Sequence, residues 1–169
     1  MISPAWCVTM AQYNRWMNGK LYAAAATLPG EARKRDLGAF FKSLHGTLDH
    51  LLWGDTAWLA RFTGGPAVGP KRGEYFEPEF DTLRVRREAL DGSILDWAGG
   101  VAQDRLDSVL HWTGALDGKS RALPYALCVT HFFNHQTHHR GQASTLLMQL
   151  GIDPGVTDLP ALPELKALA

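Results

Sequence analysis

Apolar residues recur at the spacing of an α-helix in four long segments of the chain. The first segment covers residues 3–28, where a Ser-Pro pair is typical of a helix start and Pro29-Gly30 of a helix end. The second covers residues 39–62 and stops before Gly64-Gly65-Pro66. Both segments are predicted to be long helices.

Two more helices are predicted in the second half of the chain. One begins at the capping residue Asp81 and fades at Gly99-Gly100, and the other runs from Pro124 to Leu150. Residues 63–80 form a long connection between the second and third helices, and residues 107–122 are expected to form a short hairpin or an irregular excursion before the fourth. Four long helices without a convincing sheet predict an all-α fold, a four-helix bundle, in a single domain over residues 1–169.

The composition excludes several classes of protein. Of the 169 residues, 46% are hydrophobic and 20% charged, which is typical of a globular domain and not of a disordered chain. The 17 basic residues balance the 17 acidic ones, so the chain lacks the positive excess that nucleic-acid or anionic-membrane binding needs. No segment resembles a membrane span or a secretion signal, and Cys7 and Cys128 do not indicate a disulfide framework. We therefore expect a cytoplasmic protein that acts on a small-molecule substrate, without nucleic-acid or membrane partners.

Histidines are concentrated in the last predicted helix, within the segment THFFNHQTHHRGQ. Because each residue turns an α-helix by about 100°, His131, His135 and His139 lie along one stripe. His135 and His139 have the i, i+4 spacing by which two imidazoles on one helix bind a single metal ion. Zinc proteases with a His-Glu-x-x-His motif use this spacing, but Gln136 stands where their glutamate base would be, which argues against that mechanism.

A third ligand is expected from the second helix, which carries His45 and His50. These two histidines are five residues apart and point about 140° away from each other, so both cannot face the same ion. Gly46 and Gly54 leave room beside His50, whereas the neighbours of His45 indicate ordinary packing with a polar contact. The spacing thus favours His50 as a ligand, but it is equally consistent with a layer of hydrogen-bonded histidines that binds no metal.

Two segments resemble the signature helices of the DinB family: SLHGTLDHLLWGDTAWLARFTG at residues 43–64 and HFFNHQTHHRGQASTLLMQLG at residues 131–151. A third segment, AQYNRWMNGKLYAAAATLP at residues 11–29, resembles the first helix of that family. The resemblance covers most of the chain and weakens only over residues 63–80 and 104–123.

The resemblance implies a DinB-like four-helix bundle that often forms a homodimer and binds one divalent metal ion through three histidines. Matched position by position, these are His50, which precedes the Leu-Leu-Trp-Gly-Asp run, His135, which follows Asn134, and His139, the second of the His-His pair. They are the same three residues that the spacing favours.

Three neutral imidazoles with an open fourth coordination position suit zinc first, with nickel, iron and manganese as alternatives. Some members of the wider superfamily are thiol-dependent transferases or isomerases in which the metal activates a low-molecular-weight thiol. The resemblance therefore implies an S-transferase or isomerase, and a metal-bound water or thiolate is the expected reactive group because no dedicated acid or base stands at helical spacing from the ligands. The alternatives are a non-catalytic metal-binding bundle, a metal-hydroxide hydrolase and an interaction module whose function lies in its dimer interface.

Two other side chains share the stripe of the ligands. Gln142 and His131 are candidates for contacting a ligand imidazole or a substrate, although each could simply pack in the helix interior. Arg140 and Asp55 each point about 140° away from the ligand direction of their helix and are predicted to form an ion pair between the second and fourth helices.

Overall fold

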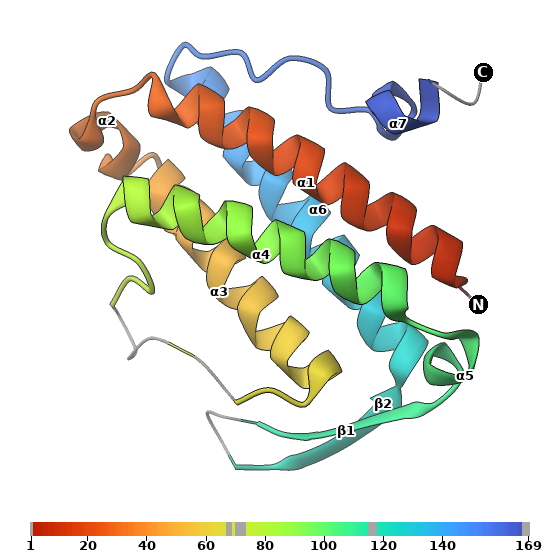
Figure 1. Ribbon diagram of the computed structural model, residues 1–169. Coiled ribbons are helices and arrows are strands. Elements are labelled where there is room, and N and C mark those ends of the chain that lie inside the picture. The colour runs from red at the N-terminus through yellow and green to blue at the C-terminus, as the bar shows by residue number, and fades with distance from the viewer. Residues whose placement is uncertain (1, 67–68, 70–73, 115–117, 167–169) are drawn as a thin grey trace.

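Four long helices make up most of the structure, a computed structural model that describes residues 2–66, 69, 74–114 and 118–166 (Figure 1). They are α1 (Pro4–Ala26), α3 (Leu44–Thr63), α4 (Phe80–Gly100) and α6 (Tyr125–Gln149). α1 packs against α4 and α6, and α3 packs against the same two helices. The largely helical fold predicted from the apolar spacing is therefore confirmed. Among the described residues, no helix is both long and apolar enough to cross a membrane.

The remaining elements are short. β1 (Val109–Thr113) and β2 (Ser120–Pro124) form an antiparallel hairpin, so the excursion predicted before the last helix is a hairpin. Residues 115–117, between the two strands, lie outside the described part of the chain, as do residues 67–68 and 70–73 of the predicted long connection between α3 and α4. The other short elements are α2 (Gly30–Lys34), α5 (Gln103–Leu106), a 3-10 turn (Leu159–Ala161) and α7 (Pro163–Lys166).

The second long helix begins later than the apolar pattern predicts. Ser43 caps α3 by accepting a hydrogen bond of 3.1 Å from the backbone N–H of Gly46, and Lys42 just before it has a left-handed φ of 65°. Residues 39–42 form a tight turn instead of a helical one, closed by a bond of 2.7 Å from the Lys42 N–H to the Ala39 carbonyl. The apolar residues of this turn continue the helical spacing upstream, so periodicity alone did not mark the boundary.

Two apolar clusters lie between the four long helices, one at each end, and a third, smaller one joins Tyr13 and Met17 of α1 to Leu162. One of the two larger clusters lies near the hairpin and includes Phe62, Ile94 and Phe132, while the other includes Leu21 and Leu48. Between them lies a set of buried polar residues, which we call the polar layer: Asn14, Asn18, Asp55, Arg87, Asp91, Gln136 and Arg140.

Arg87 is the centre of the polar layer. Its guanidinium pairs with Asp55 on α3 at 2.7 Å and with Asp91 on α4 at 2.8 Å. Asn14 and Asn18 on α1 donate to Asp91 at 3.0 and 2.9 Å. Buried charges are tolerated only when they are paired and hydrogen-bonded, and here one guanidinium serves two carboxylates.

The polar layer corrects one prediction from the sequence. Arg140 does not pair with Asp55; its guanidinium donates to the side-chain oxygen of Asn14 on α1. Asp55 takes its countercharge from Arg87, which α4 carries at a position that the apolar pattern did not single out. The polar layer thus joins all four long helices instead of only two.

Candidate metal centre

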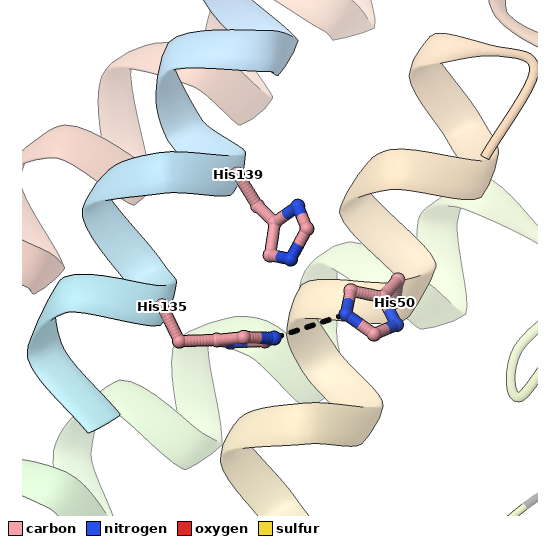
Figure 2. A group of neighbouring side chains, drawn as sticks. All are labelled: His50, His135 and His139. Carbon is pink, nitrogen blue, oxygen red and sulfur yellow. Dashed lines mark hydrogen bonds between the residues drawn. The ribbon is translucent and has the colours of Figure 1, made fainter. Parts of the chain in front are cut away.

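His50 on α3 and His135 and His139 on α6 point toward one another (Figure 2). The Nε2 atoms of His50 and His135 are 3.1 Å apart. The ring centroid of His139 lies 4.6 Å from that of His50 and 4.4 Å from that of His135. One nitrogen from each ring lies within 4.8 Å of the other two. The structure thus brings together the three histidines singled out in the sequence.

Glycine at position 54 lets the two helices come close at this point. A Cβ atom on Gly54 would lie only 2.9 Å from Cε1 of His135, closer than such atoms approach, so the imidazole occupies space that any other residue would fill. Gly46 has a different role from the one predicted. A Cβ atom there would collide with the backbone carbonyl of Phe41, so Gly46 makes room for the turn into α3 and not for an imidazole.

Gln142 holds His139 in one tautomer. The side-chain oxygen of Gln142 accepts a hydrogen bond of 2.7 Å from Nδ1–H of His139, which leaves the lone pair of His139 on Nε2. The amide nitrogen of Gln142 donates to Nε2 of His138 at 3.2 Å. Of the two candidate neighbours named from the sequence, Gln142 therefore contacts a histidine of the cluster through a hydrogen bond.

Phe41 covers the cluster, and sequence reasoning missed it. Its ring stacks on His50 with centroids 3.9 Å apart and meets His139 edge-on at 5.4 Å. Trp53 lies on another side of His50, with ring centroids 5.5 Å apart. The apolar pattern placed Phe41 inside the second helix, where its ring would not reach His50 in this way. Because the helix start was predicted too early, the contact between Phe41 and His50 could not be predicted.

The three imidazoles are neutral at neutral pH. Burial lowers the pKa of His50 to about 4 and the pKa of His135 to about 3, and a charge on a neighbouring histidine lowers both further. The pKa of His139 is also lowered, again mainly by burial. Neutral imidazoles keep the lone pairs that a metal ion needs, and protons compete with it only in acid.

The other histidines have different surroundings. His45 is buried and its Nε2–H donates to the Glu77 carbonyl at 2.9 Å, which fits the packing role expected for it. Asp49 binds the same segment by accepting from the backbone N–H groups of Phe76 and Glu77. His131 lies beside His135 with ring centroids 5.8 Å apart, outside the group of converging nitrogens.

The donor set fits a divalent metal ion. Two nitrogens bound to one tetrahedral zinc ion at 2.0–2.1 Å would be about 3.3 Å apart, close to the 3.1 Å between His50 and His135. A layer of hydrogen-bonded histidines, the alternative allowed by the sequence, would account for this contact with one shared proton. Nδ1 of His135 is buried without a hydrogen-bond partner among the described residues, and it stays so whether Nε2 binds a metal ion or shares a proton with His50.

Comparison with known proteins agrees with the resemblance seen in the motifs. The model of the DinB family matches residues 1–167, so the chain belongs to the DinB family. It is also similar to Protein DinB of Bacillus subtilis (strain 168), with 24% identity over 156 residues that cover 87% of each chain.

Proposed function

We propose that this chain is a four-helix-bundle metalloenzyme in which His50, His135 and His139 bind one divalent ion. We further propose that it acts, as a cytoplasmic homodimer, in S-transfer or isomerisation that depends on a low-molecular-weight thiol. Zinc is the first candidate for the ion, followed by nickel, iron and manganese. The proposal rests on one observation, the convergence of three neutral imidazoles without a carboxylate among them.

In this proposal the residues around the histidine cluster orient its rings and limit their contact with water. Gln142 orients His139 so that Nε2 faces the cluster, and Gly54 admits the His135 ring between the helices. Phe41 and Trp53 keep water from much of the His50 ring. A bound divalent ion supplies positive charge that lowers the pKa of a thiol or water in its remaining position.

A non-catalytic metal site is the second candidate, and one observation favours it. Phe41 stacks directly on His50, and within the described residues no Asp, Glu or Cys joins the cluster to move a proton. A metal ion bound in this way would stabilise the fold without turnover. A hydrolase that uses metal-activated water is a third reading of the same donor set.

The thiol proposal is tested with cobalt(II) in place of the native ion. A thiolate bound to cobalt gives a near-ultraviolet charge-transfer band that imidazole and water do not give. Cys7 and Cys128 are buried, and burial raises the pKa of both thiols, that of Cys7 to about 11, so the protein alone should give no band. We expect the band to appear on adding 2-mercaptoethanol and to be absent from the His139→Ala variant. If no thiol changes the spectrum while small anions do, thiol transfer is wrong and the hydrolase or the non-catalytic site is favoured.

A further inference from the structure

A group of cationic and aromatic side chains adjoins the histidine cluster on the side of His135. His131 lies between His135 and Trp58, with ring centroids 5.8 Å from the former and 5.0 Å from the latter. Trp58 in turn lies 5.9 Å from Trp112 on the hairpin, and the guanidinium of Arg61 lies over the Trp58 ring at 4.5 Å. We call His131, Trp58, Arg61, Trp112 and Arg121 the arginine–tryptophan patch.

Positive charge gathers in this patch. Arg121 is the cross-strand partner of Trp112, and its charge, together with burial, lowers the pKa of Arg61. The charge of Arg61 also reaches His131, whose pKa it lowers in addition to the effect of burial. Within the described part of the chain no carboxylate forms an ion pair with Arg61. The guanidinium groups of Arg61 and Arg121 therefore lie near each other, beside partly buried indole rings.

Arg61 is held differently from Arg87, a buried arginine of the polar layer. Arg87 shows how this protein buries a guanidinium for stability, with two carboxylates in contact. Arg61 is half-buried over the Trp58 ring and forms no ion pair with a carboxylate among the described residues. Arginine held flat on an aromatic ring presents its N–H groups outward, in a fork that matches a carboxylate.

The distance from the histidine cluster suits one small molecule. Gly54 lies against His135, and Arg61 is seven residues further along α3. Seven residues correspond to a rise of about 10 Å. A ligand with its reacting atom at the cluster could therefore place a second group on Arg61 while its middle crosses His131 and Trp58.

We propose that the arginine–tryptophan patch binds a carboxylate of the molecule that reacts at the histidine cluster. That molecule is thus an anionic thiol, whose sulfur reaches the histidine cluster while its negative group lies on Arg61. Trp58 and Trp112 supply apolar contact for the part in between. This inference rests on the proposed function for the thiol, but the anion site itself depends only on the patch.

Two thiols of different charge test this inference. The cobalt-loaded protein is titrated with glutathione, which carries two carboxylates, and with neutral 2-mercaptoethanol, following the near-ultraviolet band. The variants are Arg61→Gln, the charge-conserving Arg61→Lys, and Arg105→Gln as a matched control. Arg105 also lies over an aromatic ring, that of Tyr125 at 4.5 Å, but outside the patch.

We expect Arg61→Gln to weaken glutathione about tenfold and 2-mercaptoethanol less than twofold, because one charge-assisted contact is lost. Arg61→Lys should recover part of the loss, and Arg105→Gln should bind both thiols like the wild type. Equal effects on both thiols, or no effect on either, would overturn the inference while leaving thiol binding at the cluster intact.

A third ligand separates failure of the anion site from failure of the thiol proposal. S-methylglutathione keeps both carboxylates but has no free thiol, and its binding to the zinc-loaded protein can be followed by calorimetry. If no thiol produces the cobalt band but S-methylglutathione binds and Arg61→Gln weakens it, the anion site stands and the thiol proposal fails. If thiols produce the band but Arg61→Gln changes the affinity of neither glutathione nor S-methylglutathione, the anion site is wrong.

Discussion

Two polar clusters lie between the long helices: the polar layer and the histidine cluster. They differ in which partners their charges and lone pairs have. In the polar layer, the guanidinium of Arg87 contacts two carboxylates, and Asn14 and Asn18 complete the hydrogen bonds of Asp91. In the histidine cluster, three neutral rings converge with no carboxylate among them. The polar layer joins all four long helices, whereas the histidine cluster joins α3 and α6 only.

The comparison shows how a polar cluster that stabilises the fold differs from a cluster that is a candidate binding site. In the polar layer, Asp55 and Asp91 both have their countercharge in Arg87, and removing Arg87 leaves both carboxylates unpaired. In the histidine cluster one proton can be shared between His50 and His135, and a metal ion at the cluster would instead be bound by the lone pairs of all three rings. Substitutions in the first should therefore change stability, and substitutions in the second should change metal binding.

Arg87→Ala is expected to have the largest effect, a loss of about 3–5 kcal/mol in the free energy of unfolding, because Asp55 and Asp91 are left buried without their countercharge. Urea unfolding followed by circular dichroism measures it. Arg86→Ala is the control, since its ion pair with Glu77 is partly exposed and should contribute less than about 1 kcal/mol. A loss below 1 kcal/mol for Arg87→Ala would contradict the structural role of Arg87. An Arg87→Ala variant that folds but no longer binds metal would show that the polar layer and the histidine cluster are not independent.

Zinc is expected to raise the melting temperature of the metal-free protein by roughly 10 °C at a concentration one thousand times its Kd, through preferential binding to the folded chain. His50→Ala should show almost none of this increase, because only two ligands remain. Chelation should lower the melting temperature without unfolding the protein at room temperature, since the two apolar clusters do not involve the metal. Loss of helical circular dichroism on chelation would favour the non-catalytic structural site.

Gln142→Ala is expected to weaken metal binding 10- to 100-fold, the usual effect of removing the hydrogen bond that orients a ligand histidine. Competition with a chromophoric chelator measures the Kd. Asn134→Ala is a suitable control because Asn134 is exposed on the same helix and should leave the Kd unchanged. Equal metal affinity in wild type and Gln142→Ala would show that Gln142 does not orient His139 for metal binding.

The pH dependence of stability separates the two clusters by sign. In the folded chain His50 and His135 stay neutral down to a pKa of about 4 and about 3, whereas unfolded histidine titrates near 6.5. The unfolded chain therefore binds more protons in this window, so the histidines make the metal-free protein less stable as the pH falls from 6.5 toward 4.

Asp55 acts in the opposite direction. Burial raises its pKa to about 6 against the pull of Arg87, so its contribution makes stability fall as the pH rises from about 4 to 6. Urea midpoints of the metal-free protein across this range should rise with pH. The slope should be shallower in a His50→Ala, His135→Ala double variant, and identical slopes would contradict the assigned pKa values.

Much of this architecture could be predicted from the sequence because it follows from periodicity and local chemistry. The four long helices, the hairpin and the alignment of His135 with His139 all depend on spacing along the chain. The choice of His50 over His45 followed from the small residues beside His50, and one of them, Gly54, makes room for the His135 ring that His50 contacts.

The rest depends on contacts that spacing does not encode. The turn before α3 is apolar, so it extends the helical pattern and hides the position from which Phe41 reaches His50. The partner of Asp55 is set by how α4 lies against α3, and two residues 32 positions apart carry no local signal of pairing. The arginine–tryptophan patch likewise forms only when the hairpin folds against α3.

Metal content is the most direct test of the central claim. Wild-type protein and four alanine variants, at His45, His50, His135 and His139, would be purified without chelator, incubated with zinc, desalted and measured by elemental analysis. The three cluster histidines predict about one ion per chain in the wild type and in His45→Ala, and almost none in His50→Ala, His135→Ala or His139→Ala. Equal metal content in wild type and His50→Ala, with both proteins folded, would contradict the metal centre and favour a layer of hydrogen-bonded histidines.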